Sequence, residues 1–189
     1  SLETLAHEAG VGMTTLPSNR DSLASKIQDS LESFEKQLNA PEDEYYLLAL
    51  EYPNTGHVVG TSGILSYTGK RKPFYSYKLG TLAHFSQELS IHKQVQTLSL
   101  VNDLTGISEV CTLFLSAHHR KGRNGRFLSR VRFLFMAEHP QRFHQSVIAE
   151  MRGVQDEEGK SPFWRNLGSY FFDMDFSKAD YLSAVGNKQ

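Results

Sequence analysis

Cysteine is nearly absent from this sequence, with Cys111 the single example among 189 residues. One cysteine excludes an internal disulfide, and its place in an apolar run predicts a small buried side chain. The eight histidines show no H-E-x-x-H spacing, and there is no cysteine cluster to bind zinc. We therefore expect no bound metal and no permanently bound cofactor.

Long hydrophobic runs and an excess of one charge are also missing. No apolar stretch reaches the roughly 20 residues that cross a bilayer, and no signal-peptide pattern is present. Lys and Arg number 20 against 21 for Asp and Glu, which gives a net charge of −1 and no global bias toward nucleic acid. These absences predict a cytoplasmic protein with neither membrane nor nucleic acid as its partner.

The elements present alternate between helical and strand patterns, which is an α/β order. The length suits one hydrophobic core, so we expect a single domain over residues 1–189. Helical spacing predicts helices over residues 1–9, 19–38, 127–135 and 162–167, and residues 177–185 are expected to form a short polar helix or a turn. Strand patterns cover residues 45–52, 57–67, 74–85, 96–101, 110–115, 146–151 and 170–174. Gly60 and Gly63 predict a bulge or close backbone packing in the second strand.

A strand that leads through a basic turn into a helix forms the centre of the chain, over residues 109–138. The turn consists of Arg120, Lys121, Gly122, Arg123, Asn124, Gly125 and Arg126. Glycines allow close backbone approach, while the N–H groups and the dipole at a helix start favour an anion. A local basic cluster in a nearly neutral chain suits a small polyanion. A solvated helix face remains an alternative interpretation.

The turn lacks both the Walker pattern and the dinucleotide-binding G-x-G-x-x-G pattern. It resembles the R/Q-x-x-G-x-G/A pyrophosphate loop of the GCN5-related N-acyltransferase superfamily, with Arg120 first, Gly125 last and Arg123 replacing a usual glycine. The resemblance implies an acyl-coenzyme A site and a mixed, mostly antiparallel central sheet flanked by helices. It also implies that the superfamily's first strand is missing ahead of Ser1. Trp164 stands where a tyrosine is common, and we expect it to pack in the core.

Longer stretches are similar to the bacterial arginine N-succinyltransferases. They cover residues 10–19, 102–115, 120–135, 147–164 and 172–181. The resemblance implies transfer of succinyl from succinyl-coenzyme A to the α-amino group of L-arginine in arginine catabolism, with a succinyl-coenzyme A contact at Leu113. The family chain continues past Gln189 and carries its proposed proton-donor histidine there. We therefore expect a coenzyme-binding fragment, inactive or slow alone, with any oligomer formed through the later part.

Acyl transfer also needs a base for the amine proton, and two glutamates are candidates. Glu109 and Glu150 lie on or beside neighbouring predicted strands, although either could instead form a strand-end ion pair with Arg152. Simple alternation places Glu109 and Cys111 on one strand face with Leu113 and Leu115, next to the expected thioester.

The arginine acceptor and the carboxylate of the succinyl group each need a charged side chain to bind them. Asp103 or Asp173 could bind the guanidinium of arginine, and Arg152 or Lys78 could bind the succinyl carboxylate. Two rival functions stay open: a non-catalytic module that binds acyl-coenzyme A or nucleic acid, and an acyltransferase with another acyl donor or amine.

Overall fold

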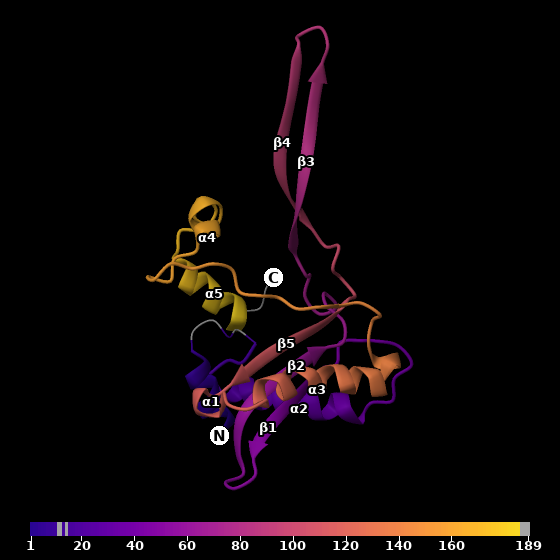
Figure 1. Ribbon diagram of the computed structural model, residues 1–189, viewed down its shortest axis with the longest axis vertical. Helices are drawn as coiled ribbons and strands as arrows, with labels where there is room; N and C mark the ends of the chain where they lie inside the picture. The colour runs from indigo at the N-terminus through magenta and orange to yellow at the C-terminus, as the bar shows by residue number, and fades with distance from the viewer. Residues whose placement is uncertain (11–12, 14, 186–189) are drawn as a thin grey trace.

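A computed structural model describes residues 1–10, 13 and 15–185. It shows a domain of helices around a sheet, from which a long hairpin projects (Figure 1). Residues 11, 12 and 14 of the loop at 10–19, which carries part of the family resemblance, lie outside the described residues. In the described part, no helix combines the length and apolar character required to span a bilayer.

The central sheet has four strands in the order β1-β2-β5-β6. β1 (Tyr45–Tyr52) and β2 (His57–Leu65) form an antiparallel hairpin, and β5 (Ser108–Leu115) is antiparallel to β2. β6 (Val147–Ile148) pairs with the start of β5 in parallel. The expected fold class, a mixed and mostly antiparallel sheet flanked by helices, is confirmed.

Helix α2 (Arg20–Glu35) covers the outer edge of β1. Its Ser30 and Ser33 hydroxyls accept hydrogen bonds from the backbone N–H groups of Leu47 and Tyr45, at 2.9 and 3.1 Å. Asn19 caps the helix by accepting a hydrogen bond from the backbone of Ser22. The serines thereby satisfy an edge that would otherwise be free to pair with another strand.

Helix α3 (Asn124–Glu138) packs on β2 and β5. Its far end contributes Phe135 to an aromatic cluster with Tyr46, Phe143 and Phe34, whose ring centroids lie 5.0 to 5.8 Å apart. Near its start, Leu128 comes so close to Gly60 that a Cβ atom there would lie 2.8 Å from a Leu128 methyl group. The predicted close packing at Gly60 is thus confirmed, and it holds the start of α3 against the sheet.

The hairpin of β3 (Ser76–Ser86) and β4 (Ile91–Val101) is separate from the central sheet. The sequence predicted both strands, although it began the second one at residue 96 instead of 91. Apolar side chains along the hairpin are exposed, including Leu79 at 81% and Phe85 at 75%. At its base, Tyr77 contacts Phe163 with ring centroids 5.2 Å apart. Exposed apolar surface of this extent is unusual for an isolated domain.

Two strand predictions near the end of the chain are wrong. The expected strand over residues 146–151 is only two residues long, and most of that segment is exposed. The expected strand over residues 170–174 is instead a 3-10 turn, Gly168–Tyr170, followed by irregular chain. Aromatic residues there suggested a strand, but Tyr170 and Phe171 are exposed. Phe172 instead stacks on Trp164 at 5.7 Å, and Trp164 donates to the Met174 carbonyl at 2.9 Å.

The remaining elements are short. They are α1 (Leu2–Ala9), α4 (Pro162–Asn166), α5 (Phe176–Val185), and 3-10 turns at Ala117–His119 and Pro140–Arg142. Arg142 of the second turn donates to the Ser33 and Lys36 carbonyls at 3.0 and 2.9 Å. It therefore satisfies the end of α2, which has no basic residue in its own last turn.

Candidate functional site

A bulge interrupts β5 in the middle of the sheet. Thr61 of β2 pairs with Phe114 and Gly63 pairs with Cys111, so one residue of β2 faces two of β5, Thr112 and Leu113. Thr112 has a φ of 51°, which is rare for a β-branched residue. A bulge takes an extra residue out of the hydrogen-bonded ladder, so backbone groups become available to a ligand.

Side-chain contacts hold the bulge in place. The Thr61 hydroxyl donates to the Thr112 carbonyl at 3.0 Å, and the Thr112 and Tyr45 hydroxyls share a hydrogen bond of 2.9 Å. Gly63 provides the space, because a Cβ there would lie 3.0 Å from the Thr112 hydroxyl and 3.1 Å from that of Tyr45. The sequence predicted a bulge or close packing in β2 itself; the extra residue here belongs to β5, and Gly63 contributes the close packing.

The bulge also changes which side chains share a face of β5. Simple alternation placed Glu109 and Cys111 on the same face as Leu113 and Leu115. The structure instead puts the two leucines beside Leu128 of α3, whereas Cys111 contacts Thr112 near Tyr45. The single-face prediction is therefore wrong, because an inserted residue reverses the alternation beyond it.

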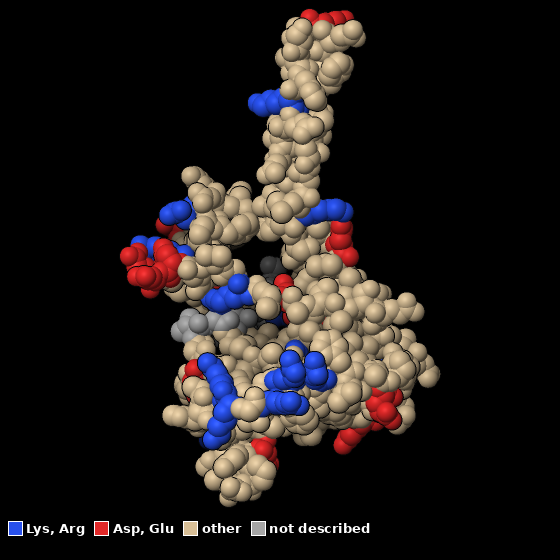
Figure 2. Space-filling model, viewed as in Figure 1, with Lys and Arg blue, Asp and Glu red and all other residues tan. Residues whose placement is uncertain are grey.

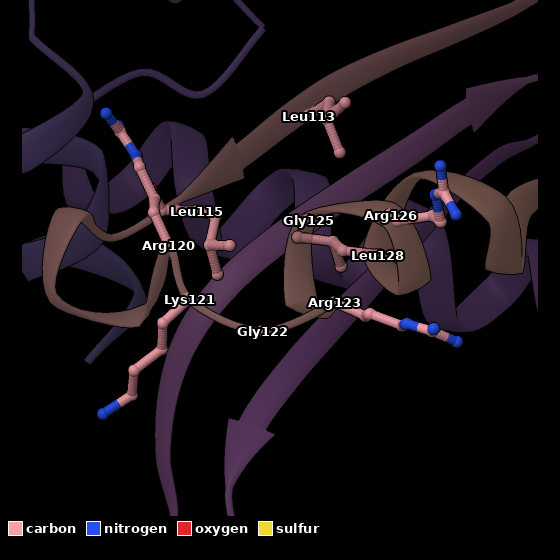
Figure 3. A pocket seen from close by; sticks show the side chains of 9 residues that line it. All are labelled: Leu113, Leu115, Arg120, Lys121, Gly122, Arg123, Gly125, Arg126 and Leu128. Carbon is pink, nitrogen blue, oxygen red and sulfur yellow. The ribbon is translucent and has the colours of Figure 1, made fainter.

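A cavity of about 550 Å³ lies between the bulged strand and the start of α3. This volume is within the range of small-molecule sites. Figure 3 shows Leu115, Gly125 and Leu128 at its centre, with basic side chains fanning outward around them. The residues lining it are Leu113, Leu115, Arg120, Lys121, Gly122, Arg123, Gly125, Arg126 and Leu128.

The start of α3 is open to an anion. Its N-cap residue, Arg123, makes no side-chain cap, and the first turn contains no acid. The first N–H groups of a helix have no acceptor within the helix, so those of Gly125 and Arg126 are available. Gly122 has a φ of 61°, a conformation that favours glycine in this turn.

Arg120 supports this turn as well as lining the cavity. Its Nε donates to the Leu115 carbonyl at 2.8 Å, and its guanidinium lies 5.6 Å from the centre of the Phe114 ring. Figure 2 shows Lys and Arg side chains gathered on the face that α3 covers. Asn124 was predicted to belong to the site, but its side chain donates to the His119 carbonyl at 3.1 Å and it does not line the cavity.

Glu109 is a buried acid at the point where β5 and β6 separate. Its side chain is 8% exposed. Its pKa is raised to about 7, mainly by burial and also by the nearby charge of Glu150, whereas Lys26 opposes the increase. No ion pair of Glu109 occurs in the part of the chain that the structure covers. The arrangement therefore favours a proton-transfer group over the strand-end ion pair.

The other candidate residues lie outside the cavity. Glu150 is exposed beyond the end of β6, and Asp173 is exposed as well. Asp103 accepts from Lys78 at 2.9 Å near the base of the hairpin. Arg152 donates to Asp180 at 2.9 Å.

Among the described residues, one cluster of carboxylates is spaced closely enough to hold a cation. It consists of Glu42, Asp43 and Glu44, whose carboxylates lie within 4.8 Å of one another. Each already binds a cationic side chain: Lys70, Arg71 and Lys36 respectively. These ion pairs account for the group without a metal.

Comparison with known proteins identifies the family. A family model described as the arginine N-succinyltransferase beta subunit matches residues 1–189. The chain belongs to this family. Its relatives include arginine N-succinyltransferase subunit beta of Pseudomonas aeruginosa, 50% identical over 188 residues, and arginine N-succinyltransferase of Yersinia enterocolitica, 50% identical over 184 residues. The matches cover 100% and 97% of this chain but only 55% and 53% of those proteins.

A solved structure agrees with this assignment. The chain is similar to arginine/ornithine succinyltransferase subunit AI from Pseudomonas aeruginosa, with a TM-score of 0.91 and 38% identity. The similarity covers 98% of this chain and 56% of the other. The chain thus spans about half the length of the arginine N-succinyltransferases that it matches.

Sequence reasoning missed three residues of this region. Leu128 was recognised as apolar helix surface but not as part of the cavity. Tyr45 and Lys26, which lie close to each other on the opposite side of the bulge, were not selected at all. The glycines of β2 were the one available signal, because they predicted a bulge or close packing in their own strand without showing that β5 carries the extra residue.

Proposed function

We propose that this protein takes part in the transfer of succinyl from succinyl-coenzyme A to the α-amino group of L-arginine, and that it binds the coenzyme. The observation that carries the proposal is the cavity that joins the open start of α3 to the bulge of β5. The names of the relatives, which are arginine N-succinyltransferases, support the same reaction.

The pyrophosphate of the coenzyme would lie at the start of α3. Free N–H groups and the helix dipole favour its negative charge there. Lys121, Arg123 and Arg126 surround the position with positive charge. Gly125 adds no side chain, so the phosphates can approach the backbone closely.

The pantetheine arm would follow β5 from the cavity to the bulge. Leu113 and Leu115 give it an apolar surface. Backbone groups that the bulge releases from the ladder would hydrogen-bond the thioester carbonyl and stabilise the oxyanion that forms there.

Glu109 would accept the proton of the attacking amine. With its pKa raised to about 7, its carboxylate is partly ionised and sufficiently basic near neutral pH. The α-amino nitrogen forms a bond to the thioester carbon, the carbon–sulfur bond breaks, and coenzyme A leaves as its thiolate. The proton lost by nitrogen passes to Glu109, directly or through water.

Titration calorimetry with coenzyme A and succinyl-coenzyme A tests the binding site, using Gly125→Val as the variant. A Cβ at Gly125 meets only a Leu115 methyl group at 3.9 Å, so the fold has room for a substituent that points toward the cavity. We expect affinity for both ligands to fall by about tenfold or more, because displacing even one charge-assisted hydrogen bond has that effect.

Gly153→Val is the matched control, because a Cβ at Gly153 meets nothing within 4 Å and Gly153 lies outside the cavity. Both variants should keep the circular dichroism spectrum of the unsubstituted chain. Unchanged coenzyme affinity in folded Gly125→Val would show that the start of α3 is not the pyrophosphate site.

A further inference from the structure

A lysine ammonium lies on the α2 side of the sheet without a counter-ion. Lys26 Nζ donates to the Thr15 carbonyl at 2.9 Å and lies 5.0 Å from the centre of the Tyr45 ring. An ammonium has three donors, and this is its one hydrogen bond to the described residues. No carboxylate there lies within ion-pair distance of it.

This position is unfavourable for a positive charge by itself. Burial lowers the pKa of Lys26, while more distant attractions from Cys111, Asp29 and Glu109 oppose that effect. Burial keeps the Cys111 thiol protonated, with a pKa of about 11, and it also favours the neutral form of Glu109. A half-buried cation is costly unless an anion pairs with it, so the site is suited to an anionic ligand.

Lys26 and the bulge contact the same side chain. The Tyr45 ring faces the ammonium, and its hydroxyl shares a hydrogen bond of 2.9 Å with the hydroxyl of Thr112. A thioester held at the bulge would place its acyl chain close to this tyrosine. In a succinyl group the free carboxylate is three carbon–carbon bonds from the thioester carbon, which is roughly 4 Å.

Other cations near the sheet already have acceptors. Lys78 and Arg152, which the sequence suggested for the succinyl carboxylate, each bind an aspartate at 2.9 Å. Arg132 donates to the Cys111 carbonyl at 3.3 Å and to the carbonyl and hydroxyl of Ser129, both at 3.1 Å. That arginine fastens α3 to β5, so among these cations, which lie outside the α3 cavity, Lys26 is the one that the contacts leave for a substrate.

We propose that Lys26 binds the free carboxylate of the succinyl group on the α2 side of the β5 bulge. It would thereby favour succinyl-coenzyme A over coenzymes whose acyl group carries no charge. This inference rests on the proposed function. The α-carboxylate of arginine has the same chemistry, and the experiment separates these two sources.

Calorimetric titration of coenzyme A, acetyl-coenzyme A and succinyl-coenzyme A into the chain and into Lys26→Met provides the test. Met retains the apolar stem against Tyr45 and removes the ammonium, and with it the charge and the hydrogen bond to the Thr15 carbonyl. We expect the preference for succinyl- over acetyl-coenzyme A to fall by about tenfold to a hundredfold. The affinity for coenzyme A itself should not change, because its phosphates bind at the start of α3.

Three further variants serve as controls. Lys26→Arg keeps the charge and should retain most of the preference. Lys26→Gln is a second uncharged variant, which keeps the test decisive if Lys26→Met fails to fold. Lys93→Met makes the same chemical change on the exposed strand β4 and should alter none of the three affinities.

Each remaining outcome contradicts the assignment in a different way. An unchanged preference in a folded, uncharged variant would overturn the role of Lys26 and leave the proposed function in place. A loss restricted to arginine affinity, measured with coenzyme A bound, would assign Lys26 to the amino-acid carboxylate and overturn the acyl assignment. If the unsubstituted chain bound neither coenzyme A nor succinyl-coenzyme A, the proposed function would fail and this inference with it.

Discussion

Glu109 must be negatively charged to act as the base in the proposed reaction, but its buried location disfavours that charge. In the folded chain its pKa is raised to about 7 from 4.5, mainly by burial. The folded state therefore binds more protons than the unfolded state between these two pH values. Glu109 therefore stabilises the fold at low pH, where it is protonated. This contribution to the free energy of unfolding is lost as pH rises through the window, and no further loss occurs above it.

Glu109→Gln should remove this pH-dependent loss. Near pH 4 the free energy of unfolding should match that of the unsubstituted chain, whereas at pH 8 the variant should be more stable by about 1–3 kcal/mol. Denaturant unfolding at several pH values measures the difference. The exposed Glu157→Gln provides the control. Destabilisation of Glu109→Gln at pH 8 would instead indicate that the carboxylate makes a favourable ion pair.

At the scale of elements, α2 stabilises the sheet by covering an edge strand. Ser30 is 4% exposed, and its hydroxyl accepts from the Leu47 backbone N–H at 2.9 Å. Removing the hydroxyl leaves that N–H without an acceptor. A buried unsatisfied donor costs about 1–3 kcal/mol, so Ser30→Ala should lower the free energy of unfolding by that amount.

Ser25→Ala is the matched control, because Ser25 lies on the same helix but is exposed. It should change stability by no more than about 0.5 kcal/mol. Both values follow from denaturant unfolding at one pH. Equal effects of the two substitutions would mean that water, rather than Ser30, satisfies the edge of β1.

For the hairpin of β3 and β4 we expect the opposite, a small effect on stability when it is removed. Its two strands form a sheet of their own, separate from the central sheet. Replacing residues 76–101 by an Asn-Gly turn should leave the domain folded, since those two residues favour a tight reversal. We expect the melting temperature to change by only a few degrees, about the effect of 1 kcal/mol or less. Coenzyme affinity should stay the same. A collapse of the thermal transition would show that the hairpin supports the domain.

At the scale of the whole molecule, binding and turnover should be separable. The chain spans about half the length of its relatives, whereas the cavity proposed for the coenzyme is lined by residues between 113 and 128. We expect residues 1–189 to bind succinyl-coenzyme A and yet to release free thiol slowly or not at all when arginine is added. A thiol-release assay measures this, with a full-length relative as the positive control. Turnover equal to that of the relative would mean that Glu109 and its neighbours suffice for the chemistry.

The sequence alone determined those features that depend on neighbours along the chain. The strand, basic turn and helix around Gly122 and Gly125 follow from local spacing and backbone preference, and the structure gathers eight of the nine residues predicted for the coenzyme at one cavity. The fold class was predictable for the same reason, with the family resemblance supplying the sheet type. The predicted strand over residues 170–174 is wrong because Phe172 stacks on Trp164, a contact that alternation does not encode.

Only the tertiary structure decided which chemical groups meet. The pairing of β2 with β5 creates the bulge at Thr112 and reverses the faces beyond it, so alternation along β5 could not place Leu113. The burial of Glu109 and the approach of Lys26 to Tyr45 depend on elements distant in sequence. The same holds for the exposed hairpin, whose strands look like ordinary sheet members in the sequence. Local patterns specify an element, whereas register, burial and charge proximity arise from its partners.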